Sequence, residues 1–163
     1  MRRIQNLMEQ WLFIGPDNRQ EQVNLPHTWN AKDGQDGGND YYRGTCHYEK
    51  TFEKPEFDPK TEEVYLEFLG VNASSDVTVN GKELAHHDGG YSTFRVNITE
   101  ALQEQNKLEV TVDNSVNGKI YPQKADFTFY GGIYRDVRFL IVSKEHFDLD
   151  YLGSNGIKIT PEV

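Results

Sequence analysis

The fold of this chain is constrained most by short runs in which apolar and polar residues alternate, as Leu108, Val110 and Val112 do with their polar neighbours. Because side chains along a β-strand point to opposite faces in turn, this pattern is typical of a strand with one buried face. Comparable runs predict strands over residues 44–52, 64–68, 76–79, 82–87, 94–96 and 137–142, with residues 146–151 as a further candidate. Asn80-Gly81 separates two of these runs and is a strong hairpin signal. The sequence therefore predicts an all-β fold, an antiparallel β-sandwich.

The size and charge of the chain narrow the classes of protein to which it can belong. With 163 residues, 36% of them hydrophobic and 26% charged, it suits one folded domain with a real hydrophobic core. The formal net charge of −9 argues against nucleic acid and anionic membranes as partners, whereas a neutral ligand such as a sugar is not repelled. Cys46 is the single cysteine, so no intrachain disulfide can form, and its place in an alternating run predicts a buried, small apolar residue.

The expected compartment follows from the hydrophobic runs. No apolar run approaches the length that spans a membrane, and residues 4–10 are too polar for the apolar part of a signal peptide. The sequence therefore favours a cytoplasmic location. A periplasmic or secreted location would follow if a leader has been trimmed from the sequence.

One stretch, Asp126-Phe-Thr-Phe-Tyr-Gly-Gly-Ile-Tyr-Arg-Asp-Val137, combines a carboxylate, an aromatic cluster and two glycines just before a predicted strand. A carboxylate beside aromatic rings can hold a sugar, because its oxygens accept hydroxyl hydrogen bonds and the rings cover apolar C–H surface. The simpler interpretation is a buried turn with core aromatics and a surface aspartate, since short motifs are weak evidence by themselves.

No catalytic residue and no metal site can be assigned from the remaining residues. Glycoside hydrolysis normally needs two carboxylates across the scissile bond, and no pair stands out among the 26 acidic residues. Asp33 and Asp36 lie in a glycine-rich loop, but their spacing lacks the ligand set of a calcium loop. His86 and His87 are neighbours in a predicted strand, so their side chains face opposite ways and cannot easily share one zinc ion.

Several segments together resemble glycoside hydrolase family 2, the β-galactosidase and β-glucuronidase group. The matching segments, in chain order, are Val23-Asn-Leu-Pro-His-Thr-Trp-Asn30, Tyr42-Arg-Gly44, Tyr48-Glu-Lys-Thr-Phe52, Gly70-Val-Asn-Ala-Ser-Ser-Asp-Val-Thr-Val-Asn-Gly81, His87-Asp-Gly-Gly-Tyr-Ser-Thr-Phe94, Asn97-Ile-Thr99, Val112-Asp-Asn-Ser115 and the stretch from Asp126 to Val137. The resemblance covers residues 1–145 and implies the family's N-terminal sugar-binding domain, a jelly-roll β-sandwich of the galactose-binding-domain-like type. Residues 146–163 resemble the start of the immunoglobulin-like domain that follows it in this family.

The resemblance also implies where the chemistry lies. In this family both catalytic glutamates belong to a TIM barrel, which takes about 200 residues or more, so this chain alone is expected to be inactive and to need no cofactor. Asp126, six residues before the glycine of Gly-Ile-x-Arg, matches the aspartate that contacts the hydroxyls of the terminal sugar and, in some members, a sodium ion; sodium or magnesium is therefore expected in the full-length enzyme. The first long loop implies Asn30 as a second substrate-binding residue, although Thr28 stands where many members have aspartate.

Three interpretations of the function follow. The first is the non-catalytic N-terminal domain of a bacterial β-galactosidase-type enzyme, which completes the pocket for a terminal β-linked sugar, with a galactoside favoured, and contacts its own downstream immunoglobulin-like and barrel domains. The second is a freestanding carbohydrate-binding module. The third is a structural spacer in which Asp126 only supports the fold. Neither Trp11, inside an apolar run, nor Trp29, inside a family motif, resembles an exposed stacking platform, which weakens the second interpretation.

Overall fold

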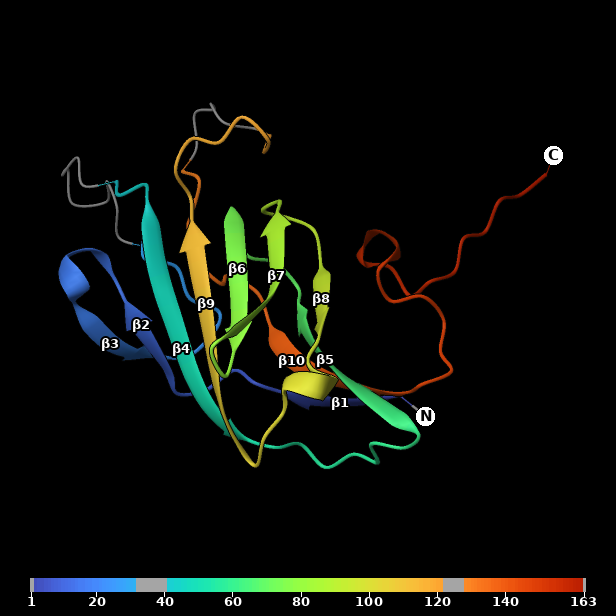
Figure 1. Cartoon of the computed structure of the whole chain (residues 1–163). Helices are drawn as coiled ribbons and strands as arrows, with labels where there is room; N and C mark the ends of the chain where they lie inside the picture. Colours follow the sequence, from blue (N-terminus) through green and yellow to red (C-terminus); the bar gives the residue numbers. More distant parts are fainter. Residues whose placement is uncertain (1, 32–40, 122–127, 163) are drawn as a thin grey trace.

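The computed structural model describes residues 2–31, 41–121 and 128–162, which form two antiparallel sheets packed face to face (Figure 1). The strands are β1 (Arg3–Asn6), β2 (Trp11–Ile14), β3 (Gln20–Val23), β4 (Thr45–Glu53), β5 (Glu62–Phe68), β6 (Ser74–Val79), β7 (Lys82–Asp88), β8 (Phe94–Asn97), β9 (Gln105–Asp113) and β10 (Val137–Ser143). One sheet has the order β1-β10-β5-β8 and the other β3-β2-β4-β9-β6-β7. The described residues contain no α-helix, only three-residue 3-10 turns, and among them no helix is long and apolar enough to cross a membrane. The predicted all-β sandwich is confirmed.

Every strand predicted from residue 44 to residue 142 is present, but β1, β2 and β3 were not predicted. All four residues of β1 are exposed, so the strand carries no alternating pattern and is held by its backbone pairing with β10. β2 is a short continuous apolar run, in which Trp11 and Phe13 face the core. β3 is polar apart from Val23 and pairs only with β2, at the edge of its sheet. β1 and β3 are edge strands, which need little apolar surface, and β2 is a short apolar run without alternation, so periodicity missed all three.

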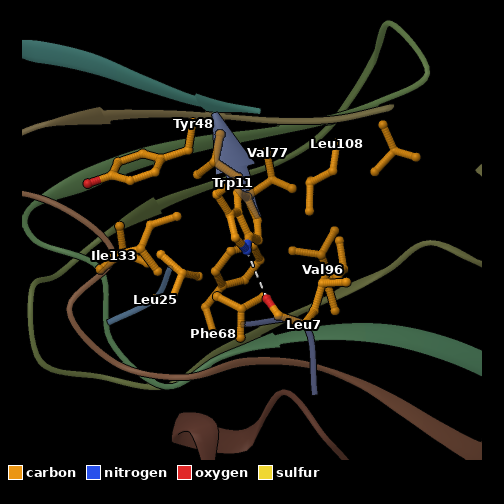
Figure 2. Packing of buried hydrophobic residues seen from close by; sticks show 14 of the residues in the cluster. Leu7, Trp11, Leu25, Tyr48, Phe68, Val77, Val96, Leu108 and Ile133 are labelled. Carbon is orange, nitrogen blue, oxygen red and sulfur yellow. Dashed lines mark hydrogen bonds between the residues drawn. The ribbon is translucent and has the colours of Figure 1, made fainter. Parts of the chain in front are cut away.

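The core lies between the two sheets and is rich in aromatic rings (Figure 2). Trp11 is fully buried, and its indole nitrogen donates a 2.9 Å hydrogen bond to the Leu7 carbonyl, so its one polar atom is satisfied. Tyr48 is also fully buried and packs against Phe13 with ring centroids 5.1 Å apart. Cys46 is fully buried, as predicted, and burial raises the pKa of its thiol to about 12.

The predicted Asn80-Gly81 hairpin joins β6 to β7. Asn80 and Gly81 both have positive φ angles, 52° and 78°, which is the backbone of a two-residue turn whose twist matches the flanking strands. The Asn80 side chain also accepts a 2.9 Å hydrogen bond from the Lys107 amide and donates a 2.8 Å bond to the Ala101 carbonyl. The turn is therefore fastened to the neighbouring strand as well as being formed locally.

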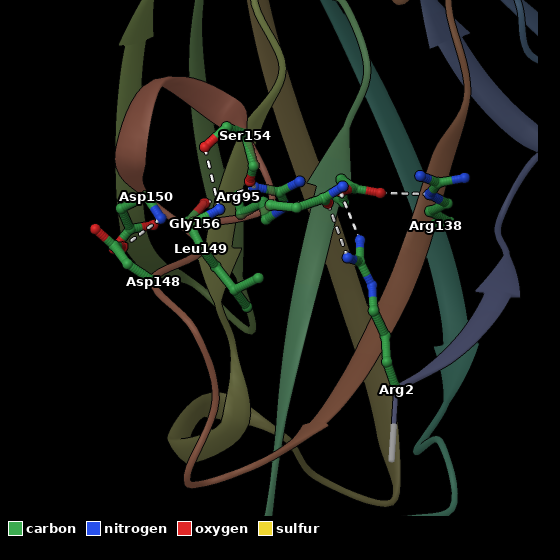
Figure 3. Close-up of polar contacts among 10 residues, drawn as sticks. Arg2, Arg95, Arg138, Asp148, Leu149, Asp150, Ser154 and Gly156 are labelled. Atoms are coloured by element: carbon green, nitrogen blue, oxygen red, sulfur yellow. Dashed lines mark hydrogen bonds and ion pairs between the residues drawn. The ribbon is translucent and has the colours of Figure 1, made fainter. Parts of the chain in front are cut away.

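A buried ion cluster lies on the outer face of the β1-β10-β5-β8 sheet, where Arg2, Arg95 and Arg138 (Figure 3) surround the carboxylate of Glu67. The Glu67 side chain is 1% exposed, and its carboxylate accepts hydrogen bonds from Arg95, at 2.7 Å, and from Arg138. Arg2 lies 3.6 Å away. Burial by itself would raise the pKa of Glu67, but the bonds from Arg138 and Arg95 outweigh it and hold that pKa below its usual value.

The same cluster fastens the segment that follows β10. The Arg95 guanidinium donates to the carbonyls of Leu149, at 2.5 Å, and Ser154, at 2.8 Å. The strand suggested for residues 146–151 was wrong: these residues form no strand and lead into a 3-10 turn over Tyr151–Gly153, and the Leu149 carbonyl meets a guanidinium instead of a neighbouring strand. The assignment of residues 146–163 to the start of another domain stays a prediction.

Candidate functional site

The candidate site lies at the end of the sandwich where the segment before β10 meets the loops after β3 and β5. Gly132 exchanges two 3.0 Å backbone hydrogen bonds with Asn72, which ties the segment to the β5–β6 loop. Gly132 has a φ of 127°, and a Cβ atom there would lie 2.6 Å from the His27 carbonyl oxygen. At Gly131 a Cβ atom would lie 2.1 Å from the Trp29 ring. Only glycine allows this close approach, so both positions fix the path of the chain.

Asn30, predicted to bind substrate, lies in this region and is 1% exposed. Its amide nitrogen donates a 2.9 Å hydrogen bond to the Tyr42 carbonyl. Its amide oxygen accepts bonds from the Gly131 amide, at 2.8 Å, and from the Asn114 side chain, at 3.2 Å. These contacts make Asn30 a support for the glycine segment, and its assignment as a substrate-binding residue stays a prediction.

Asn114 extends this buried amide network and is fully buried. Its side-chain nitrogen also donates a 3.1 Å bond to the Phe129 carbonyl, and its side-chain oxygen accepts a 2.9 Å bond from the Gly44 amide. The Tyr41 hydroxyl accepts a 2.7 Å bond from the amide of Phe129. Loops from three parts of the chain are thus bound together by buried polar groups, which are costly to leave unpaired.

A pocket with a volume of about 260 Å³ opens beside this network. Three tyrosines surround it, together with one amide and one hydroxyl side chain: Asn72, Tyr91, Thr128, Tyr130 and Tyr134. The Asn72 amide nitrogen donates a 2.8 Å hydrogen bond to the Tyr130 carbonyl, and the Tyr134 hydroxyl donates to the Gly90 carbonyl. These bonds hold together the loops that carry the rings.

Asp126, the other predicted substrate-binding residue, lies outside the described residues, as do Asp33 and Asp36. Thr128, two positions after Asp126, lines the tyrosine pocket. A larger hollow of about 580 Å³ lies elsewhere, beside the segment after β10, and includes Phe147 and Leu149. We place the candidate site at the tyrosine pocket, because it adjoins the glycine segment and the sequence stretch that contains Asp126.

His86 and His87 face opposite ways, as predicted for neighbours in a strand. His86 lies between two carboxylates, with Nδ1 2.6 Å from Asp76 and Nε2 3.2 Å from Asp88, and these hydrogen bonds raise its pKa. His87 instead stacks on Phe94 with centroids 4.1 Å apart, and burial lowers its pKa. Among the described residues no group of three or more His, Cys, Asp or Glu side chains could hold a metal ion.

Comparison with known proteins settles the family. A family model described as the glycosyl hydrolase 2 galactose-binding domain-like family matches residues 32–149. The chain belongs to glycosyl hydrolase family 2. A β-glucuronidase of Bacteroides fragilis is 43% identical over 145 residues, which are 86% of this chain and 20% of that protein. A β-galactosidase of Thermoanaerobacter pseudethanolicus is 31% identical over 161 residues, which are 89% of this chain and 22% of that protein.

Solved structures agree with the family 2 assignment. The crystal structure of an FMN-binding β-glucuronidase from Facaelibacterium prausnitzii L2-6 matches with a TM-score of 0.88 and 44% identity, covering 94% of this chain and 24% of that one. A Bacteroides uniformis β-glucuronidase matches with a TM-score of 0.82 and 33% identity, covering 95% and 20%. The family 2 domain therefore spans about a fifth of the length of the curated relatives it matches, and those relatives contain further domains.

Three of the segments that suggested the family contact one another at one edge of the family 2 domain. His27 and Trp29 from the first motif contact Gly132 and Gly131 from the last, and Asn72 from a middle motif pairs with Gly132. Sequence reasoning named Asn30, which lies at this edge, but did not identify the tyrosine pocket. Tyr91 lies inside one of the family segments, from His87 to Phe94, but the sequence does not show that its side chain lines a pocket.

Proposed function

We propose that this family 2 domain is the non-catalytic N-terminal part of a retaining β-glycosidase, in which it completes the sugar pocket of a TIM barrel that carries the catalytic glutamates. The observation that carries the proposal is the construction of the loop edge at Gly131 and Gly132, which follow Asp126 in the sequence. Two glycines in forced contacts and a buried Asn30–Asn114 amide network fix the segment that follows Asp126. A rigid support of this kind is what a substrate-positioning residue needs, because small misplacements cost binding and rate.

The proposed substrate is a terminal β-linked sugar. The sequence favoured a galactoside, but we propose a β-glucuronide first, because two of the β-glucuronidases described above share 43% and 44% identity with this chain, whereas the third shares 33% and the β-galactosidase 31%. The β-galactoside remains the second candidate.

In the proposed enzyme Asp126 accepts hydrogen bonds from the sugar hydroxyls, and Asn30 and Asn114 keep the following segment in place. The barrel supplies the general acid and the nucleophile. The described residues offer no cluster of His, Cys, Asp or Glu that could hold a metal ion, so the expected sodium or magnesium ion stays a prediction.

The test is the Asp126→Ala variant of the full-length enzyme, assayed with aryl β-glucuronides and β-galactosides. Losing one charge-assisted hydrogen bond, worth about 1.5–3 kcal/mol, should lower kcat/KM by roughly ten- to a hundred-fold. Asp150→Ala, which removes an exposed aspartate with no capping hydrogen bond on the segment after β10, is the matched control and should leave kcat/KM unchanged. Normal activity in Asp126→Ala together with a sharp fall in its melting temperature would favour the structural spacer instead.

A binding measurement on the 163-residue chain by itself tests whether it is a freestanding carbohydrate-binding module. One aspartate supplies less than the roughly 4 kcal/mol that even millimolar affinity requires, so calorimetric titration with glucuronate or galactose should show no binding tighter than millimolar. Micromolar binding to the isolated chain would support the carbohydrate-binding module and contradict the proposal.

A further inference from the structure

We infer that His27 and Tyr48 form a proton-controlled clamp, which holds residues 131–133 in place only while the His27 imidazole is neutral. The Tyr48 hydroxyl lies 2.8 Å from His27 Nδ1, so one hydrogen bond joins the loop after β3 to β4. Both partners also contact the segment before β10. The His27 amide donates a 2.8 Å hydrogen bond to the Ile133 carbonyl, and a Cβ atom at Gly132 would lie 2.7 Å from the Tyr48 hydroxyl oxygen. The clamp consists of described residues alone, so it does not depend on which ligand the site binds.

The partners of Tyr48 decide where the proton of this hydrogen bond lies. The Tyr48 side chain is fully buried, and burial raises its pKa above the ordinary value near 10, so the hydroxyl keeps its proton. Its oxygen accepts a hydrogen bond from the Ile133 backbone amide, and His27 Nδ1 is the acceptor within reach of its proton. Nδ1 is then unprotonated, and the imidazole carries its single proton on Nε2. The clamp therefore requires one tautomer of the neutral ring.

Protonation of His27 places two protons in this one hydrogen bond. An imidazolium carries a proton on each nitrogen, so Nδ1 becomes a donor that faces the Tyr48 hydroxyl. The hydroxyl must then turn its own proton away from His27, and a buried donor without an acceptor costs free energy. The imidazole also packs against the Phe13 ring, with ring centroids 4.7 Å apart, and burial lowers the pKa of His27. The charged form of His27 is therefore incompatible with the closed clamp.

The groups around His27 do little to offset this effect. β2 contributes the uncharged Phe13 ring, β4 contributes the protonated Tyr48, and the segment before β10 contributes backbone atoms. Among the described residues the carboxylate whose charge reaches His27 is Glu21 on β3, which raises the pKa of His27 by less than burial lowers it. The stability that the clamp contributes is therefore present in full above the unfolded pKa near 6.5, and it is lost as pH falls through the lower folded pKa.

Amide hydrogen exchange in the 163-residue chain tests the clamp. From about pH 7.5 to about pH 5, exchange at residues 131–133, corrected for the intrinsic effect of pH, should become roughly five- to thirty-fold faster, the factor that corresponds to one buried hydrogen bond. His47→Asn is the matched control, because His47 precedes Tyr48 on β4 but is exposed and bonds to Thr111 at 3.1 Å. This control should keep the wild-type acceleration. No acceleration in wild type would overturn the inference.

Two variants separate the hydrogen bond from the packing of the rings. Tyr48→Phe removes the hydroxyl but keeps the ring, so exchange at residues 131–133 should already be fast at neutral pH and should change little on acidification. His27→Asn offers an acceptor oxygen near the place of Nδ1 and does not titrate, so exchange should stay slow at both pH values. If both variants responded to pH as wild type does, the clamp would be excluded.

Nitrogen NMR of the wild-type imidazole gives a readout that needs no variant. At neutral pH His27 should show an unprotonated Nδ1 and a protonated Nε2, and its pKa should lie below the ordinary value near 6.5. Acidification should change the signals of residues 131–133 at the same pH at which the ring takes up its second proton. A proton on Nδ1 at neutral pH, or segment signals that ignore the titration of His27, would overturn the inference even if a variant failed to fold.

Discussion

Replacing Glu67 with glutamine should destabilise this domain strongly, because it removes the negative charge from a buried cluster of arginines. Arg95 is 3% exposed in its side chain and would be left without a charged partner. Removing one partner of a buried ion pair costs about 3–5 kcal/mol. Arg138 and Arg2 have side chains that are 25% and 36% exposed, so water compensates for much of their loss, and we expect a total near the lower end, about 3 kcal/mol.

Thermal unfolding followed by near-ultraviolet circular dichroism measures this loss. For a domain of this size about 3 kcal/mol corresponds to a melting temperature lower by about 6–12 °C. Glu62→Gln is the matched control, because Glu62 lies on the same strand and pairs with Arg3 at 2.6 Å, but with side chains that are 20% and 42% exposed. This surface pair should cost less than about 1 kcal/mol. Equal shifts in the two variants would refute the argument from burial.

The pH dependence gives an independent check. The pKa of Glu67 is held below its unfolded value by Arg138 and Arg95, against the effect of burial, so its contribution to stability is fully present above the unfolded pKa of about 4.3 and is lost as pH falls through the lower folded value. Wild type should therefore lose stability on acidification more steeply than Glu67→Gln. Because Arg95 also holds the carbonyls of Leu149 and Ser154, the variant should show faster hydrogen exchange around residues 149–156.

Two further predictions concern the histidines and the amide network. In an NMR titration the pKa of His86, which is bonded to Asp76 and Asp88, should lie above the ordinary value near 6.5, and the pKa of His87, which is buried against Phe94, should lie below it. The stability that His86 contributes is then present below its unfolded pKa and is lost as pH rises through its folded pKa. The reverse order would contradict the contacts. Asn114→Ala should lower the unfolding free energy by about 2–3 kcal/mol, because it leaves buried partners unpaired. Chemical denaturation measures this, and a loss below about 0.5 kcal/mol would show that water replaces the amide.

The strands that sequence could predict are those in which the burial pattern and the chemical pattern coincide. β9 is the clearest case, because every second residue from Asn106 to Val112 is buried and the apolar positions fall on that face. β1 shows the opposite situation. It is a strand because β10 offers it a backbone ladder, and its own residues, all exposed, contain no trace of that partner. The neighbouring strand makes these residues a strand, so the periodicity of their own sequence cannot predict it.

Only part of the candidate site could likewise be predicted from the sequence. The stretch from Asp126 to Val137 could be recognised because its residues are contiguous and its glycines mark a forced backbone path. The tyrosine pocket could not, because Asn72, Tyr91 and Tyr130 are separated by tens of residues and become neighbours only through the Asn72–Gly132 bridge and the folding of both sheets. Loops at the end of a sandwich are brought together by tertiary structure alone.

The two kinds of buried polar group in this domain hold different segments of the chain in place. The Glu67 cluster is ionic and lies on the outer face of one sheet, where it fixes the segment that leaves β10. The Asn30–Asn114 network is neutral and lies at the loop edge. A cation lies beside this network, because the Arg43 guanidinium donates a 2.8 Å hydrogen bond to the Asn114 backbone carbonyl and lies 5.4 Å from the centroid of the Phe129 ring. The two groups therefore hold different segments: the ionic cluster holds the segment after β10, and the amide network holds the glycine segment before it.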